Sequence, residues 1–290
     1  MADSLMDLIK TLRARTGAGI MDCKAALLAT DNDLDKAADW LREKGLAKAA
    51  KKADRIAAEG LALVITCPKC GKTVVLEVNC ETDFVSRGEQ FHEFVNEIGQ
   101  ILLKNEPKTL DEAKALTQEL FADATIKMGE KFDLRRYVIV PKDENVIGSY
   151  IHMGGKIAVV VVLDKADDEF AKQVAMHIAA NNPQYVSMND VPEDVKAHEL
   201  EVQKEAAKND EKLANKPANV LEKILEGKVT KYFADMTLEC QPFLYDDSKT
   251  VGQILKEKGF KVLSFVRYQV GEGIEKRQDD FASEVMSQVK

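Results

Sequence analysis

Two cysteines separated by two residues are the first feature of the sequence that could carry chemistry. Cys67 and Cys70 lie in the run Cys-Pro-Lys-Cys-Gly, which is the strongest metal-like signal in the chain. A structural zinc site needs four ligands and normally takes them from two such pairs. The remaining cysteines are isolated from one another: Cys23, Cys80 and Cys240. We therefore expect no tightly bound zinc and no other cofactor, but a hairpin turn that carries two free thiols.

Signatures of catalysis and of nucleotide binding are missing from the sequence. It contains neither the Gly-x-x-x-x-Gly-Lys-Ser/Thr phosphate loop nor the Gly-x-Gly-x-x-Gly fingerprint. No histidine has a second histidine at metal-ligand spacing or a Ser/His/Asp context: His92, His152, His177 and His198. The sequence therefore predicts a protein that is not an enzyme and that works by binding another protein. A catalytic site whose groups meet only in space stays open.

An aromatic residue in a polar turn is the best candidate for a contact surface. Phe84 follows Thr82 and Asp83 just after a predicted strand that ends at Cys80. Threonine and aspartate suit a turn or a helix cap, and the Asp83 carboxylate could orient the ring by capping the helix that follows. An exposed phenylalanine does not follow from that chemistry. We therefore interpret Thr82, Asp83, Phe84 and Val85 as a protein-binding turn.

Length and composition place the chain among ordinary globular proteins. It has 290 residues, enough for two or three domains or one elaborated domain, and 45% of them are hydrophobic. No apolar run approaches the roughly 18 residues that a membrane span needs, and the N-terminus has no apolar signal core. With five cysteines and no export signal, we expect a cytoplasmic protein with reduced thiols.

The charge balance bears on the class of partner. A formal net charge of -8 argues against broad binding to nucleic acid, which depends on basic surface. One local basic patch is present: Lys44, Lys48, Lys51, Lys52 and Arg55. Such a pattern is typical of the solvated C-terminal end of a helix, where cations suit the helix dipole. We therefore predict no membrane contact and no direct contact with nucleic acid.

The N-terminal segment has the pattern of a small helical bundle. Apolar residues at helical spacing predict three helices within residues 3–54, the last ending at Gly45. The second helix opens with Ile20 and Met21, whose side chains point about 100° apart. If the line that begins at Ile20 faces the bundle, the line of Met21 and Lys24 is at least partly exposed. Methionine suits an adaptable contact surface.

From residue 57 onward, alternating apolar residues predict strands between further helices. The predicted strands are 60–66, 73–78, 135–140, 145–152, 156–163, 265–270 and one near Leu238. The predicted helices are 88–104, 109–128, 167–181 and 251–258. Short links between neighbouring strands favour antiparallel sheets covered on one face by helices, which is an α+β fold.

Residues 192–229 form a segment of a different kind. They are strongly charged with few apolar positions, and the run Asn215-Lys216-Pro217 interrupts them. This pattern predicts a helical hairpin that projects from the body of the protein. Its apolar seam is thin, so the hairpin should be only marginally stable unless it packs against something else.

Seven stretches resemble, in order, the family of bacterial elongation factor Ts, the guanine-nucleotide exchange factor for elongation factor Tu. They are "LRARTGAGIMDCKAAL", "KAAKKADRIAAEG", "EVNCETDFV", "GSYIHMGGKIAVVV", "AMHIAA", "QPFLYDDSKTVGQIL" and "VGEGIEK". The resemblance extends over nearly the whole chain. The sequence departs from the family pattern at Cys67 and Cys70, because the family has no such pair at this hairpin tip.

The resemblance implies a particular domain organisation. A three-helix bundle of the ubiquitin-associated type would occupy residues 1–55. A two-part core of antiparallel sheets with helices would follow, its first half in 56–140 and its second half in 141–191 and 230–270. The helical hairpin, 192–229, is then inserted in the second half, and a C-terminal module takes up 271–290.

The resemblance also implies roles for particular residues. In the family, the turn that matches Thr82 to Val85 meets the GTPase domain of elongation factor Tu, and the residue that matches Phe84 inserts between partner helices near the magnesium site. Ile20, Met21 and Lys24 match the N-terminal contact surface, and His152 matches a contact of the second core half. The implied function is to promote GDP release by disturbing the magnesium and nucleotide site, staying bound until GTP binds.

Two matters stay open at this stage. A homodimer or a 2:2 complex with the partner is compatible with the sequence. An alternative function is a zinc-assisted RNA-binding or chaperone-like interaction module, which would use Cys67, Cys70 and the basic patch.

Overall fold

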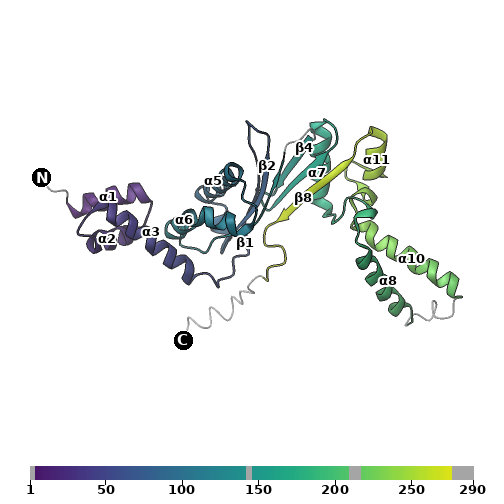
Figure 1. Cartoon of the computed structure of the whole chain (residues 1–290), viewed down its shortest axis with the longest axis horizontal. Coiled ribbons are helices and arrows are strands. Elements are labelled where there is room, and N and C mark those ends of the chain that lie inside the picture. The colour runs from purple at the N-terminus through teal and green to yellow at the C-terminus, as the bar shows by residue number, and fades with distance from the viewer. Residues whose placement is uncertain (1–3, 142–145, 209–216, 276–290) are drawn as a thin grey trace. The chain divides into compact units, whose positions relative to one another are not determined.

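The computed structural model describes residues 4–141, 146–208 and 217–275. The chain forms two compact units. One contains Met1–Pro141, Met153–Ile157 and Tyr268–Lys290, and the other contains Lys142–His152 and Ala158–Arg267. Each unit has a three-stranded sheet with helices (Figure 1). The predicted α+β class is therefore confirmed.

Three helices form the N-terminal part of the first unit: α1 (Leu5–Thr16), α2 (Ile20–Ala29) and α3 (Leu34–Lys51). Local signals set their starts, because Ser4 caps α1 and Asp33 caps α3 through side-chain oxygens. Gly17 ends α1 in the left-handed region at φ 69°. The buried centre of the bundle consists of Ile9, Leu12, Ala18, Cys23, Ala26, Leu27, Ala37 and Leu41.

The third helix runs past the glycine at which we predicted its end. Gly45 is buried where α3 packs against α6 (Leu110–Met128). A Cβ atom at Gly45 would lie 2.6 Å from Cδ1 of Ile126 and 2.9 Å from the carbonyl oxygen of Ala122. The glycine therefore permits close helix packing instead of stopping the helix. The alanine- and lysine-rich residues after it are good helix formers and carry α3 to Lys51.

The sheet of the first unit has the order β1-β2-β3, with both pairs antiparallel. Its strands are β1 (Glu59–Thr66), β2 (Thr73–Cys80) and β3 (Asp133–Val140). Strand β2 lies in the centre and is buried over its whole length. Helices α5 (Glu89–Asn105) and α6 build the core with it, largely through Phe91, Phe94, Val95, Ile98, Leu76 and Val78. The predicted hairpin and the two predicted helices after it are confirmed.

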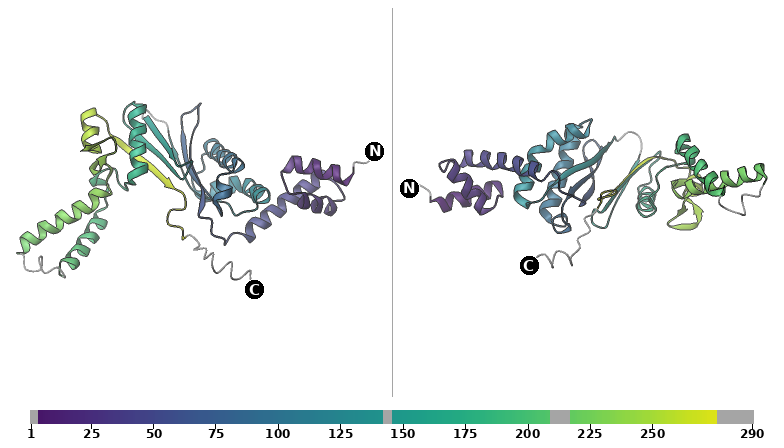
Figure 2. Two further views of the ribbon diagram at one scale, coloured as in Figure 1. Left: turned by 180° about the vertical axis from the view of Figure 1, so that it is seen from behind. Right: turned by 90° about the horizontal axis from the view of Figure 1, so that it is seen from below.

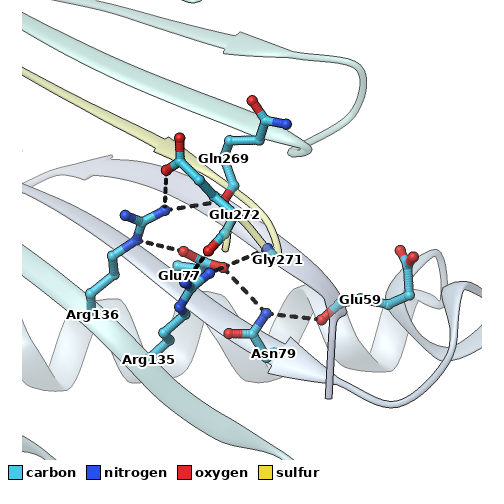
Figure 3. A network of polar contacts seen from close by, with 8 residues as sticks. All are labelled: Glu59, Glu77, Asn79, Arg135, Arg136, Gln269, Gly271 and Glu272. Carbon is cyan, nitrogen blue, oxygen red and sulfur yellow. Dashed lines mark hydrogen bonds and ion pairs between the residues drawn. The ribbon is translucent and has the colours of Figure 1, made fainter. Parts of the chain in front are cut away.

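A buried carboxylate fastens the C-terminal part of the first unit. Glu77 on β2 has no exposed side-chain surface. Its two oxygens accept from Nη1 of Arg135 at 3.0 Å, Nε of Arg136 at 2.6 Å and the backbone N–H of Gly271 at 2.9 Å (Figure 3). Nδ2 of Asn79 also donates to it at 3.2 Å. A buried charge is stable only when it is paired and hydrogen-bonded, so this arrangement holds the segment around Gly271 in place.

Gly271 meets a conformational requirement at this point. Its φ is 72°, and a Cβ atom there would lie 2.2 Å from the carbonyl oxygen of Ala58. Only glycine can adopt that backbone conformation and also lie so close to the carbonyl oxygen of Ala58. Residues 276–290, most of the predicted C-terminal module, lie outside the described part of the chain.

The sheet of the second unit has the order β4-β5-β8. Its strands are β4 (Val146–His152), β5 (Ile157–Leu163) and β8 (Val262–Gln269). Helix α7 (Asp168–Asn181) packs on β4. Gly148 permits this contact, because a Cβ atom there would lie 2.6 Å from Cβ of Ala171. A further helix, α11 (Val251–Lys258), follows a small two-stranded sheet of β6 (Pro242–Phe243) and β7 (Asp246–Thr250).

One predicted strand is wrong. Residues Leu238–Cys240 form a single 3-10 turn, and the nearest strand, β6, begins at Pro242. The N–H of Leu238 donates to the carbonyl oxygen of Tyr185 at 2.9 Å, and the N–H of Gln241 donates back to the carbonyl oxygen of Leu238 at 3.2 Å. These tertiary and local hydrogen bonds bend a segment whose apolar residues alone resemble a strand.

The charged insertion forms two helices, α8 (Glu193–Lys208) and α10 (Ala218–Asp235). They run side by side in Figures 1 and 2 and contact each other. Their shared apolar seam is small: Leu200, Ala207, Leu221, Ile224 and Leu225. Asn215 and Lys216 of the predicted break lie outside the described residues. Among the helices that are described, none has the length and apolar character to cross a membrane.

Candidate protein-binding site

The polar turn after β2 presents an aromatic ring to solvent. It contains the short helix α4 (Asp83–Ser86). The side chain of Phe84 is 86% exposed, whereas Val85 packs against the core and Ser86 is buried. Burying a phenylalanine side chain typically contributes about 1.5–3 kcal/mol to folding. Because Phe84 is exposed, its side chain does not contribute that free energy, whereas the neighbouring Val85 and Ser86 are packed against the protein.

A carboxylate from a distant part of the first unit holds the backbone of this turn. Glu130 lies between α6 and β3. Its Oε2 accepts the backbone N–H of Glu81 at 2.9 Å and that of Thr82 at 3.1 Å, and its Oε1 accepts the Thr82 hydroxyl at 2.5 Å. Hydrogen bonds to a charged acceptor are stronger than neutral ones. The start of the turn is therefore fixed from outside.

A second carboxylate, that of Glu81, connects the same two segments, here with the acceptor next to the Phe84 turn and the donor next to Glu130. Oε1 of Glu81 accepts the backbone N–H of Lys131 at 2.7 Å, and its Oε2 pairs with Nη1 of Arg55 at 3.2 Å. The Lys131 ammonium group in turn donates to the carbonyl oxygen of Arg55 at 2.7 Å. The segment that follows α3, the turn before β3 and the Phe84 turn are thus joined in one network.

Sequence reasoning did not find this network. Glu130 follows Gly129, whose left-handed φ of 77° ends α6. A glycine after a periodic apolar segment does signal a helix end. No sequence signal indicates which backbone amides the next carboxylate will reach, because Glu130 and Thr82 are far apart in the chain.

The predicted capping role of Asp83 is wrong. Thr82 caps α4, since its hydroxyl oxygen accepts the N–H of Val85 at 3.3 Å. The following helix, α5, starts after Gly88 without a side-chain cap. Asp83 instead pairs with Nη2 of Arg87 at 2.9 Å, and both side chains are more than half exposed. Such surface pairs contribute little to stability.

An apolar hollow lies beside the ring of Phe84. It has a volume of about 710 Å³, and its lining residues are Asp83, Phe84, Val85, Arg87, Gly88, Glu89, Gln90, Phe91 and Met128. The turn therefore offers a projecting ring next to a recess, which suits contact with apolar side chains of another protein.

A second exposed apolar strip lies on α2. Ile20 is 52% exposed, Met21 74% and Leu28 60%, and Lys24 is exposed beside them. Cys23 is fully buried, so the helix turns the line of Cys23 toward the bundle. The prediction that the Met21 line is exposed is confirmed. Ile20 is half exposed as well, because it stands at the very start of the helix.

Most cations of the basic patch are engaged by other groups of the protein. Lys44 and Lys48 each place Nζ 3.1 Å from a carboxylate oxygen of Asp22. Burial alone raises the pKa of Asp22, but hydrogen bonds and charge attraction from Lys48 and Lys44 outweigh it and leave the pKa lowered. Arg55 is engaged by Glu81. Two carboxylates thus pair with three of the five cations, and the Lys52 ammonium group donates to the carbonyl oxygen of Gly129.

His152 belongs to the second unit. It ends β4 and is half-buried, with its Nδ1 3.1 Å from the hydroxyl of Tyr150 and the two rings 5.8 Å apart. His177 has a packing role instead. Its Nε2 lies 2.9 Å from Oε1 of Gln241, and its Nδ1 accepts the N–H of Leu244 at 3.2 Å. Burial lowers the pKa of His177, which favours the neutral ring.

The described residues place no group of three or more His, Cys, Asp or Glu side chains where they could hold a metal ion. Cys67 and Cys70 are free thiols at the tip of the β1–β2 hairpin. The three candidate surfaces taken from the sequence thus lie on separate elements: the Phe84 turn after β2, the exposed strip of α2 and the end of β4.

Comparison with known families gives two matches. The family model described as "Elongation factor TS" matches residues 81–272, which is more than half of the chain. A second model, described as "Elongation factor Ts, mitochondrial, N-terminal", matches residues 1–50. The first match includes the Phe84 turn and His152, and the second includes the exposed strip of α2.

Proposed function

Because the chain belongs to the elongation factor Ts family, we propose that it binds elongation factor Tu in its GDP form and promotes release of the GDP. One observation carries the proposal. Phe84 is 86% exposed on a turn whose backbone is held by Glu130 and by its own Thr82 cap. An exposed ring on a fixed backbone can insert into another protein without a change in the conformation of the turn.

The energetics follow from linkage between two ligands of one partner. A GDP complex of nanomolar affinity is held by about 12 kcal/mol. Part of that free energy depends on a magnesium ion that bridges protein and phosphate oxygens. A protein that stabilises the arrangement without magnesium weakens GDP binding by its coupling free energy. By reciprocity, the nucleotide weakens binding of that protein by the same amount.

The proposed role of each residue is mechanical. The ring of Phe84 inserts between helices of the GTPase domain near the magnesium site, with Thr82, Asp83 and Val85 forming the rest of that contact. The hydrogen bonds of Glu130 hold the backbone of the turn in place while the ring inserts. The protein stays bound until GTP enters, so no covalent step and no cofactor is required.

Two further surfaces would add contact area away from the nucleotide. Ile20, Met21 and Lys24 on α2 present two apolar side chains and one cation. His152 presents a ring whose Nδ1 is engaged by Tyr150. We propose that these surfaces strengthen binding to elongation factor Tu, because they lie on elements other than the Phe84 turn.

The proposal also includes the setting and the assembly. We propose a bacterial partner in the cytoplasm, with one chain binding one partner or two chains forming a homodimer in a 2:2 complex. The description of the matched N-terminal model names mitochondria, so the assay uses elongation factor Tu from both sources. Faster stimulated release with the bacterial partner is expected, and the reverse order would overturn this part. Light scattering of the complex gives its stoichiometry.

The deciding experiment is stopped-flow release of fluorescent GDP from elongation factor Tu. Wild-type protein should accelerate release strongly. Phe84→Ala should reduce the stimulated rate about tenfold or more, since each 1.4 kcal/mol of lost coupling is a factor of ten. Tyr245→Ala is the control, because Tyr245 is a half-exposed aromatic residue of the second unit. An unchanged rate in a well-folded Phe84→Ala variant would overturn the proposal.

A further inference from the structure

The tip of the β1–β2 hairpin is a tightly closed turn. The N–H of Cys67 donates to the carbonyl oxygen of Lys72 at 2.8 Å, and the N–H of Gly71 donates to the carbonyl oxygen of Cys67 at 2.8 Å. Gly71 has a φ of 70°, in the left-handed region that glycine adopts without strain. This closure brings the backbone nitrogen of Cys70 within 3.4 Å of the Cys67 sulfur.

One backbone amide points at the sulfur of Cys67, because the N–H of Cys70 donates to Sγ of Cys67 at 3.4 Å. The ammonium group of Lys72 pairs with Glu106 and interacts more weakly with both thiols. The pKa of Cys67 is lowered to about 7 by hydrogen bonding from the Cys70 thiol, the largest contributor, and from the backbone amides of Cys70, Lys69 and Gly71.

The five cysteines differ in accessibility and in the direction in which the protein shifts their pKa. Cys70 is exposed and Cys67 is half-buried at the same tip. Cys23 and Cys80 are fully buried, and burial raises the pKa of the Cys80 thiol to about 12. Cys240 is half-buried, and burial raises its pKa as well. A thiolate is the reactive form of cysteine, so accessible thiolate character is concentrated at the hairpin tip.

We propose that Cys67 and Cys70 form a reversible dithiol–disulfide couple that exchanges with small disulfides of the glutathione class. The geometry carries this: two cysteines separated by two residues lie on one closed turn, the Cys70 N–H points at the Cys67 sulfur, and the Cys70 side chain is open to solvent. The proposal is independent of the exchange function, because the thiols lie at the opposite end of β2 from the Phe84 turn.

The exchange takes place in two balanced steps. The Cys67 thiolate attacks one sulfur of the disulfide RSSR, forming a mixed disulfide and releasing RS⁻. Cys70 then loses its proton to solvent and attacks the Cys67 sulfur, forming the Cys67–Cys70 bond and releasing the second RS⁻. The two protein thiols are oxidised and RSSR is reduced to two RSH. An excess of RSH reverses both steps.

The test uses the full-length protein, reduced and then freed of reductant, with oxidised glutathione as the probe. Samples are quenched in acid over time, alkylated and mapped by mass spectrometry. The Cys67–Cys70 disulfide should form at least tenfold faster than any modification of Cys23, Cys80 or Cys240. Reduced glutathione should return the pair to thiols.

Two single variants separate the steps. Cys70→Ser should stop at a glutathione adduct on Cys67, and Cys67→Ser should form no internal disulfide. Thermal melts of both variants check that the fold is retained, which the exposed tip favours. Three results would overturn the proposal: a wild-type adduct on Cys67 that never resolves, reaction at the tip no faster than at Cys240, or thiols held by a metal ion until a chelator is added.

Discussion

Strand β2 has a functional turn at each end, and the two turns are held in different ways. At its C-terminal end, the Phe84 turn depends on Glu130 and Lys131, which come from the connection between α6 and β3. At its N-terminal end, the Cys67 turn is closed by its own backbone through Lys72 and Gly71. The backbone of the first turn is held by tertiary contacts and that of the second by local ones, although the Lys72 side chain also pairs with Glu106 at the end of α5.

The difference matches the task that we propose for each turn. An aromatic ring that pushes into another protein needs a backbone that resists force, and charge-assisted hydrogen bonds from a second segment supply that resistance. A dithiol needs only that two sulfur atoms meet, which a short closed turn achieves without outside help. Changes in distant residues should therefore alter the Phe84 turn and leave the Cys67 turn unchanged.

The largest expected effect separates the exposed ring from a buried ring nearby. Phe91 is fully buried in the core beneath the turn, whereas Phe84 is 86% exposed. Phe91→Ala should lower the free energy of unfolding by about 3–5 kcal/mol. Phe84→Ala should change it by about 0.5 kcal/mol or less. Urea unfolding measures both, and a loss at Phe84 comparable to that at Phe91 would place its ring in the core.

Removing the outside anchor should have the next largest effect. Glu130→Ala removes the charged acceptor of two amides and a hydroxyl to which water has access, which should cost about 1 kcal/mol of stability. Stimulated GDP release should fall several-fold, and Glu130→Gln should recover part of the rate because it keeps one acceptor oxygen. Glu119→Ala is the control, since Glu119 is an exposed glutamate on α6. Normal release by Glu130→Ala would show that the anchor is dispensable.

The local turn can be disturbed from within. Gly71→Ala places a Cβ atom at a φ of 70°, which should cost about 1–2 kcal/mol. It should also slow closure of the Cys67–Cys70 disulfide, because the turn that aligns the thiols is strained. GDP release should stay at the wild-type rate. If release fell with disulfide formation unaffected, the two turns would not be independent.

The smallest effect is a pH dependence. The pKa of Cys67 is lowered to about 7 in the folded protein, below the roughly 8.5 of an ordinary thiol. Alkylation of Cys67 should therefore rise with a midpoint near pH 7, as the thiolate fraction grows. The Cys67 thiolate also stabilises the folded protein. This stabilisation is present above the unfolded pKa and is lost as pH falls through about 7. Rates of iodoacetamide labelling in wild type and Glu130→Ala should have the same midpoint, and a shift in the variant would contradict the separation.

Local patterns in the sequence determined most of the secondary structure. Periodicity predicted the β1–β2 hairpin, α5, α6 and α7, because a period of two or of about 3.6 follows directly from which face is buried. The exposure of Met21 follows from the same geometry. An aromatic in a polar turn pointed to Phe84, since no local chemistry required it there.

Only the tertiary structure decided the other features. Gly45 packs against α6 instead of ending a helix, and the segment at Leu238 turns because Tyr185 accepts its N–H. Thr82, not Asp83, caps α4, and Glu130 reaches it across a long stretch of sequence. Periodicity reports burial within one element. It cannot report which distant donor and acceptor meet, because that depends on how several elements pack at once.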